Sequence, residues 1–98
     1  MRLMKKQKHV VAVHPGLVLR DELEEVGISQ TKLSRQIRVL PKTVNEICRG
    51  KRGISAEMAV RLSLALGASP QFWLNLQKNW ELSQVNERKL GLIEKVAA

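Results

Sequence analysis

The apolar residues of this chain recur mostly at intervals of three and four, the spacing that places side chains on one face of an α-helix. Five such stretches lie between residues 14 and 80, and turn residues separate them. The pattern predicts an all-α fold: a compact five-helix domain with a helical extension at its C-terminus. The short β-prone run from His9 to Val13 is the exception. It is interpreted as a strand that pairs with another chain or as an extended arm over the core, and the arm is favoured.

Turn and capping residues set the limits of the first, fourth and fifth predicted helices. The first follows the turn His14-Pro15-Gly16 and ends at Gly27, which suits the left-handed conformation at a helix C-terminus. The fourth runs from a Ser55 cap to Gly67, and the fifth begins at Ser69, which a proline follows. Their apolar positions at helical spacing are Leu19, Leu23 and Val26, then Met58, Ala59, Leu62, Ala65 and Leu66, then Phe72, Trp73 and Leu76.

The second and third predicted helices lie within residues 29–50, SQTKLSRQIRVLPKTVNEICRG. Ser29 can cap the second helix, and Pro41 suits the first turn of the third helix, which is expected to end at Gly50. The connection, Arg38-Val39-Leu40, is too short for anything but a sharp turn. The inward positions are Leu33 and Ile37 in one helix and Val44, Ile47 and Cys48 in the other. Two short helices joined in this way predict a helix-turn-helix, with an ordinary helical hairpin as the alternative.

The corner between these helices departs from the usual pattern. A glycine is common there because the backbone often takes a positive φ, whereas this chain has Arg38. A left-handed arginine costs about 1 kcal/mol. Ser34, which is small, fits a close approach of the two helices.

Length, charge and cysteine content limit the class of protein. Ninety-eight residues with a net charge of +8 suggest one domain with a polyanionic partner. Residues 29–53 carry seven basic residues against one acidic residue, and residues 1–13 carry four basic residues. We expect a flexible basic arm (1–13), a helix-turn-helix domain (14–80) and a partly frayed helical tail (81–98). No apolar run is long enough for a membrane span or a secretory signal, so a cytoplasmic protein with no membrane partner is expected.

No catalytic constellation is evident, so an enzyme is not expected. Cys48 lies among inward residues, which favours a buried apolar role over a reactive thiol. His9, His14 and Cys48 lack the ligand spacing that zinc favours, so neither a metal site nor any cofactor is expected.

The outward face of the third predicted helix carries the binding chemistry. Lys42 can donate to guanine O6 and N7, Asn45 can pair with adenine, and Glu46 can accept from cytosine N4. Pro41 offers only apolar contact, for example with a thymine methyl. The helix N-terminus at Ser29 presents free N–H groups to a phosphate. The complete predicted DNA-binding set is Gln30, Thr31, Lys32, Pro41, Lys42, Thr43, Asn45, Glu46, Arg49 and Lys51.

The three aromatic residues of the chain lie within nine positions of one another, at Phe72, Trp73 and Trp80. Together they cover more than one face of the fifth helix, although plain core is the alternative for Phe72 or Trp73 singly. A second buried surface is therefore expected, and a symmetric dimer is the commonest way to supply it. The predicted dimer interface is Phe72, Trp73, Leu76 and Trp80.

From His14 to about Val85 the chain resembles the HigA/VapI group of antitoxins, within the wider helix-turn-helix family of the phage Cro and CI repressors. The specific segments are His14-Pro15-Gly16, Gly50-Lys51-Arg52-Gly53-Ile54-Ser55 and Phe72-Trp73-Leu74-Asn75-Leu76-Gln77. Arg38 at the corner, and Leu40-Pro41 where members often carry a serine cap, are departures from the family pattern.

The resemblance implies an all-α homodimer that pairs through its C-terminal part and represses its own operon at a palindromic operator in double-stranded DNA. It also implies binding of a RelE/HigB-like toxin that cleaves mRNA on the ribosome, and a location in the bacterial cytoplasm, on the nucleoid at the operator. Two alternatives stay open: a stand-alone Cro/CI-like repressor without a toxin, and a toxin-binding module with weak DNA binding.

Overall fold

The structure is a computed structural model that describes residues 12–96. Its elements are α1 (Pro15–Val26), α2 (Gln30–Ile37), α3 (Pro41–Cys48), α4 (Ala56–Leu66), α5 (Pro70–Ser83) and a 3-10 helix, η2 (Glu87–Leu90). The prediction of an all-α fold with five α-helices is confirmed, and residues 12–96 contain no strand. Within this range, no helix has the length and apolar character needed to cross a membrane. The predicted basic arm, with most of its β-prone run, lies outside the described residues.

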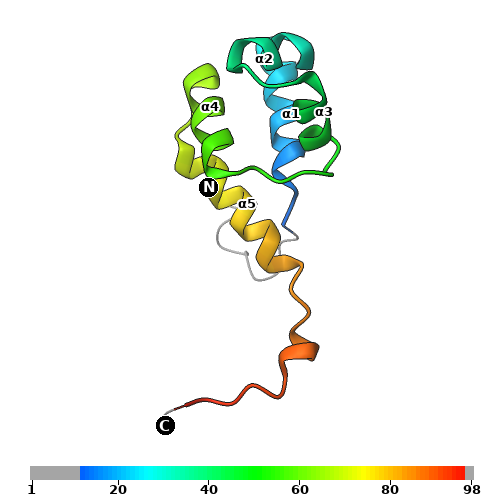
Figure 1. The fold of residues 1–98 in the computed structure, drawn as a ribbon, viewed down its shortest axis with the longest axis vertical. Coiled ribbons are helices and arrows are strands. Elements are labelled where there is room, and N and C mark those ends of the chain that lie inside the picture. Colours follow the sequence, from blue (N-terminus) through cyan, green and yellow to red (C-terminus); the bar gives the residue numbers. More distant parts are fainter. Residues whose placement is uncertain (1–11, 97–98) are drawn as a thin grey trace.

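The five helices form a bundle from which the last one projects. Helix α2 packs against α3 and α4, α1 packs against α3 and α5, and α4 packs against α5. Figure 1 shows α1 and α3 side by side, with α4 across from them and α5 leading away toward the C-terminus. The helix-turn-helix, α2 and α3, therefore lies at the end of the molecule opposite the C-terminal segment.

The core is built from predicted apolar positions of all five helices together with Ile54, from the loop before α4, which was not predicted. Its buried members are Leu19, Leu23, Leu33, Ile37, Val44, Ile47, Cys48, Ile54, Met58, Ala59, Leu62 and Trp73. Two predicted inward residues are exposed: Val26 lies at the last turn of α1, with 52% of its surface accessible, and Ala65 lies near the end of α4. Both predictions were wrong because each helix ends at a glycine within two residues of that position, where there is little packing to cover it.

Side chains cap most of the helix N-termini, as the sequence predicts. Ser29, Ser55 and Ser69 each accept a hydrogen bond from the backbone N–H three residues later. His14 caps α1 through its Nδ1, which accepts from Gly16 N–H at 2.9 Å, so the predicted turn is already part of the helix. Helix α3 is the exception among the described α-helices, because its N-cap residue is Leu40, which has no side-chain acceptor.

Gly16 lies at the closest approach between α1 and α3. A Cβ atom at this position would lie 1.8 Å from the carbonyl oxygen of Ile47, whereas ordinary contacts are 3.4 Å or longer. That carbonyl also accepts the hydrogen bond from Gly50 N–H that closes the turn after α3. The absence of a side chain at residue 16 therefore sets how closely α1 supports α3.

Helix α5 is anchored by two buried residues, Trp73 and Gln77. The Oε1 of Gln77 accepts a hydrogen bond from Ile54 N–H at 2.7 Å, which fixes the loop before α4 to α5. Because Trp73 is only 1% exposed, it belongs to the core, and its prediction as a dimer-interface residue was wrong. Neighbouring helical positions point in directions about 100° apart, and Phe72, at 43% exposure, is the outward member of the pair.

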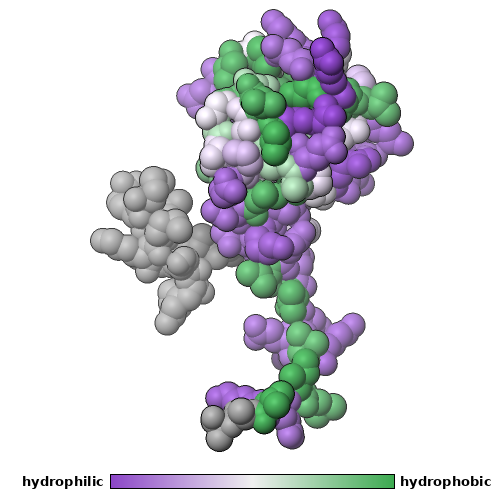
Figure 2. Space-filling model, turned by 60° about the vertical axis from the view of Figure 1, so that its left-hand side comes forward, coloured by the Kyte–Doolittle hydropathy of each residue, from purple (hydrophilic) through white to green (hydrophobic). Residues whose placement is uncertain are grey.

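The C-terminal segment differs from the predicted helical tail. Helix α5 ends at Ser83, and only the 3-10 turn η2 follows within residues 84–96. Apolar side chains along this segment are exposed, and Figure 2 shows them on the stem that leaves the body. They are Leu82, Val85, Leu90, Leu92, Ile93 and Val96. The segment thus carries apolar surface that this protomer leaves uncovered.

Candidate nucleic-acid interface

Helix α2 is held by a cap at its start and by a small buried residue along its length. Ser29 Oγ accepts from Lys32 N–H at 3.0 Å. Ser34 has no exposed surface, and its hydroxyl donates to the carbonyl of Thr31 at 2.7 Å. A larger side chain at residue 34 would separate α2 from its neighbours, so the expected role of Ser34 at a close approach is confirmed.

The corner after α2 takes the left-handed conformation although it holds an arginine. Arg38 has φ 62° and ψ 48°, and it is the only non-glycine residue with a positive φ among residues 12–96. The N–H of Val39 donates to Ser34 O at 3.0 Å, and the N–H of Arg38 donates toward Arg35 O at 3.3 Å. This is the Schellman arrangement, in which a positive φ lets two N–H groups reach carbonyls of the last helical turn.

Helix α3 presents one face to the core and the other to solvent. Val44, Ile47 and Cys48 are buried, as predicted, and the helix ends at Cys48, two residues before the predicted limit. Burial raises the pKa of the Cys48 thiol, which fits an unreactive core residue. The predicted DNA-binding residues on or after α3 that are exposed are Pro41, Lys42, Asn45, Arg49 and Lys51. Thr43 and Glu46 are half-buried.

A side-chain hydrogen bond joins the start of α2 to the outer face of α3. Asn45 Nδ2 donates to Gln30 Oε1 at 3.2 Å, across fifteen positions of sequence. Thr31 and Lys32 are exposed on the first turn of α2 beside this contact. The structure therefore places the residues predicted for phosphate contact and those predicted for base contact on one continuous surface.

Glu46 is already engaged within the protein. Its Oε1 accepts hydrogen bonds from Arg52 Nε at 2.9 Å and from Arg52 Nη2 at 2.7 Å, and its Oε2 lies 3.9 Å from Lys42 Nζ. The hydrogen bonds from Arg52 hold the pKa of Glu46 below its ordinary value. Because both of these hydrogen bonds are to Oε1, the contact of Glu46 with cytosine stays a prediction and would use Oε2.

Sequence reasoning missed two arginines of this region. Arg52 lies six positions after Glu46, beyond the end of α3, so the i, i+4 rule for helical pairs does not find it. Arg61 lies on α4, and Nη1 of its guanidinium donates to the carbonyls of Ile37 and Arg38 at the corner. No local pattern relates residue 61 to residue 37, because tertiary packing alone brings α4 to α2.

The surface around α2 and α3 is strongly basic. Residues 29–53 hold seven basic side chains against the single acid Glu46, a net charge of +6. All seven are exposed: Lys32, Arg35, Arg38, Lys42, Arg49, Lys51 and Arg52. With Glu46 paired to Arg52, little negative charge is left to repel a polyanion.

The model of the helix-turn-helix family HTH_3 matches residues 19–73, more than half of the chain. The chain belongs to this family. Within it, the chain is 43% identical to Pseudomonas aeruginosa antitoxin HigA, solved with the higBA promoter, at a TM-score of 0.82 over 88% of this chain and 99% of that one. It is 39% identical to antitoxin GraA, solved in complex with its operator, at a TM-score of 0.81 over 91% and 95% of the two chains.

Comparison of sequences also relates this chain to HigA-type antitoxins. Antitoxin HigA-1 of Vibrio cholerae is 33% identical over 87 residues, which are 88% of this chain and 80% of that protein. The resemblance to HigA-type antitoxins inferred from the sequence is therefore confirmed. Two of the antitoxins that this helix-turn-helix chain resembles in architecture were thus solved with promoter or operator DNA.

Proposed function

We propose that this HigA-like chain is a non-enzymatic DNA-binding antitoxin that represses its own operon. The observation that supports this most directly is the exposed basic surface of residues 29–53, on which the Asn45–Gln30 hydrogen bond joins the outer face of α3 to the N-terminus of α2. Two similar chains with this fold were solved with promoter or operator DNA. A protein with this activity works in the bacterial cytoplasm, on the nucleoid at its operator.

Helix α3 is the element that enters the major groove, which is wide enough for one helix. Lys42 and Asn45 extend from its exposed face and supply donors that discriminate between base pairs, and Pro41 supplies apolar contact. The residues around this face hold the phosphate backbone and fix the helix in register. They are Gln30, Thr31, Lys32, Thr43, Arg49 and Lys51, with the free N–H groups at the start of α2.

Glu46 and Arg52 act together in this proposal. Because Glu46 binds the Arg52 guanidinium through two hydrogen bonds, Arg52 is held next to α3 instead of extending freely into solvent. A fixed arginine loses less side-chain entropy when it binds a phosphate. We therefore assign Glu46 a positioning role and add Arg52 to the phosphate contacts.

The operator is bound by a dimer, with half-sites about one DNA turn apart, roughly 34 Å. The pairing surface is proposed on α5 and the segment after it. Phe72 is exposed, while Leu76 and Trp80 are half-buried, and the apolar residues after Leu82 extend this surface. The ring of Trp80 packs edge-on to His14, with ring centroids 4.8 Å apart, so only part of it is available to a partner.

The toxin partner is proposed from family likeness alone. HigA-type relatives are named antitoxins. The partner proposed for this chain is a RelE/HigB-like mRNA endonuclease, as the sequence resemblance implies. A small basic open reading frame beside the gene supports this proposal if the two products co-purify. Its absence favours the stand-alone repressor.

The test of DNA binding is a footprint of the purified chain on DNA upstream of its own gene, at about 0.15 M salt with excess competitor DNA. Protection of two half-sites one turn apart is expected. Lys42→Ala or Asn45→Ala should weaken this specific binding by roughly 1–3 kcal/mol. Lys51→Ala should weaken all sequences alike and lower the salt dependence.

The control is Lys78→Ala, which also removes one exposed cation but lies on α5, where it pairs with Glu81. It should leave the footprint intact. If neither Lys42→Ala nor Asn45→Ala changes operator affinity, α3 is not the reading helix. If the folded wild-type chain protects no DNA, the result favours the alternative function, a toxin-binding module with weak DNA binding.

A further inference from the structure

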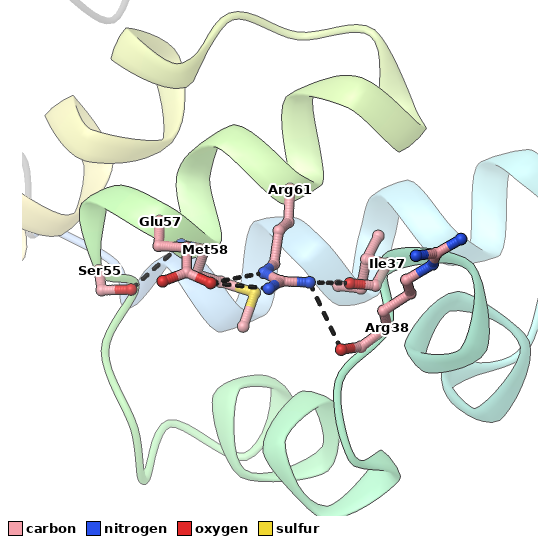
Figure 3. A network of polar contacts seen from close by, with 6 residues as sticks. All are labelled: Ile37, Arg38, Ser55, Glu57, Met58 and Arg61. Carbon is pink, nitrogen blue, oxygen red and sulfur yellow. Dashed lines mark hydrogen bonds and ion pairs between the residues drawn. The ribbon is translucent and has the colours of Figure 1, made fainter.

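The corner between α2 and α3 has a support that lies outside both helices. Figure 3 shows Arg61, on α4, extending across to this corner. Its Nη1 donates to the carbonyl of Ile37 and, at 3.4 Å, to that of Arg38. Its Nε and Nη2 donate to Glu57 Oε2 at 3.0 and 2.7 Å. One guanidinium therefore connects α4 to the end of α2 and to the corner residue that follows it.

The Schellman turn does not pair either of these two carbonyls. That turn satisfies the carbonyls of Ser34 and Arg35 through the N–H groups of Arg38 and Val39. The last carbonyls of a helix have no partner within the helix itself. A cation there also interacts favourably with the negative end of the helix dipole. Arg61 thus completes the C-terminus of α2 and opposes the strain of a left-handed Arg38.

The N-terminus of α3 has no side-chain cap of its own. Leu40 is its N-cap residue and makes no side-chain cap bond, whereas side chains cap the other four described α-helices. Only Val39 and Leu40 separate the Arg38 carbonyl from Pro41. The direction in which α3 leaves the corner therefore depends on how firmly the corner is held from outside.

We propose that Arg61 is a positioning residue for DNA recognition: by binding the carbonyls of Ile37 and Arg38, it sets the orientation of α3 in the groove. The inference rests on the proposed reading role of α3. Base contacts require a defined orientation of the helix, whereas phosphate contacts tolerate small rotations. Loss of Arg61 should therefore lower specific binding more than non-specific binding.

The first test compares Arg61→Met with the wild type on two probes at fixed salt: the upstream duplex protected in the footprint and a scrambled duplex of the same length. The ratio of the two affinities should fall about tenfold, because a charged donor to two carbonyls is lost. Using the ratio cancels the effect of removing one positive charge on non-specific binding. Lys78→Met, the matched change on α5, should leave the ratio unchanged.

Arg61→Lys keeps the charge and a flexible donor but lacks the fork that reaches Glu57 and the corner together. The ratio of specific to non-specific affinity for Arg61→Lys should lie between the ratios for the wild type and for Arg61→Met. A folded Arg61→Met variant with the wild-type ratio overturns the proposal, as does a lysine variant no better than the methionine variant.

Amide hydrogen exchange separates this inference from the proposed function, because it needs no DNA. In Arg61→Met, the amides of Arg38 and Val39 should exchange at least about fivefold faster. The amides after α1, Gly27 and Ile28, both donate to Leu23 O in a left-handed turn that Arg61 does not contact, and their exchange should not change. If the wild type binds no operator, the proposed function fails and exchange alone decides whether Arg61 holds the corner. Unchanged exchange at Arg38 and Val39 overturns the proposal in either case.

Discussion

Replacing Gly16 by alanine tests the packing that supports the reading helix. The added Cβ would lie 1.8 Å from Ile47 O and 2.8 Å from Ile47 C, both backbone atoms that cannot rotate away. Helix α1 must therefore separate from α3, or the carbonyl must turn and lose its hydrogen bond from Gly50. We expect the first turn of α1 and the end of α3 to be displaced together.

The size of the effect follows from three contributions. Overpacking a well-packed contact costs roughly 1–3 kcal/mol. Losing the hydrogen bond to Ile47 O costs about 1 kcal/mol more. The better helix propensity of alanine returns roughly 0.5–1 kcal/mol. The net loss is about 1–3.5 kcal/mol, against the roughly 5–15 kcal/mol that stabilises a domain.

The assay is thermal and urea unfolding followed by circular dichroism at fixed protein concentration. A loss of this size should lower the Tm by roughly 4–28 °C. The control is Gly91→Ala in the C-terminal segment, where φ is −63° and an added Cβ would meet Arg88 O at an ordinary 3.5 Å. It should change stability by less than about 0.5 kcal/mol. If Gly16→Ala unfolds at the wild-type temperature, the close approach of α1 and α3 does not exist in solution.

Three further predictions concern single residues. Burial lowers the pKa of His14, so folding favours the neutral ring; stability should rise with pH from that lowered pKa up to the ordinary 6.5 and then level off. His14→Asn, which keeps a capping side chain, should flatten this rise between urea titrations at about pH 5.5 and pH 7.5. Cys48 is buried and its thiol pKa is raised, so it should react slowly in the folded chain. At about pH 8, an aromatic disulfide reagent should label the native chain roughly a hundredfold more slowly than the urea-unfolded chain. Rapid labelling of the native chain would contradict the burial of Cys48. Arg38→Gly should stabilise the fold by roughly 0.5–1 kcal/mol, since the relief of left-handed strain exceeds the entropy gained by the unfolded chain. Gly27→Arg, at an open site with φ 83°, should destabilise the fold by a similar amount. If either variant has the melting temperature of the wild type, this account of the corner is refuted.

The sequence predicted the helix limits well where the signals are local. A serine cap and a terminal glycine act on backbone groups within four residues, so Ser29, Ser55, Gly27 and Gly67 have the roles that their neighbours in sequence imply. The left-handed conformation at Arg38 was also predictable, because the short connection leaves the backbone few alternatives. These features need no knowledge of the rest of the fold.

The sequence predicted less where two distant segments meet. The pairing of Glu46 with Arg52 crosses a helix end, and the contact of Arg61 with the corner crosses twenty-four positions of sequence. Similarly, apolar spacing groups Phe72 with Trp73 but does not determine which ring enters the core. That choice depends on where α4 and α5 cross, which only the assembled fold defines.

The contrast in helix capping has a consequence for the order in which the chain folds. Four helices begin at a side chain that satisfies their first N–H groups locally, so they should appear transiently before the core has formed. Helix α3 has eight residues and no such cap; the corner before it is held by α4, and its last turn packs against α1. It is therefore expected to consolidate after the folding transition state. A partly folded or nascent chain would then hold most of its helices but no surface able to recognise a nucleic acid, so DNA binding becomes possible only once the whole domain is complete.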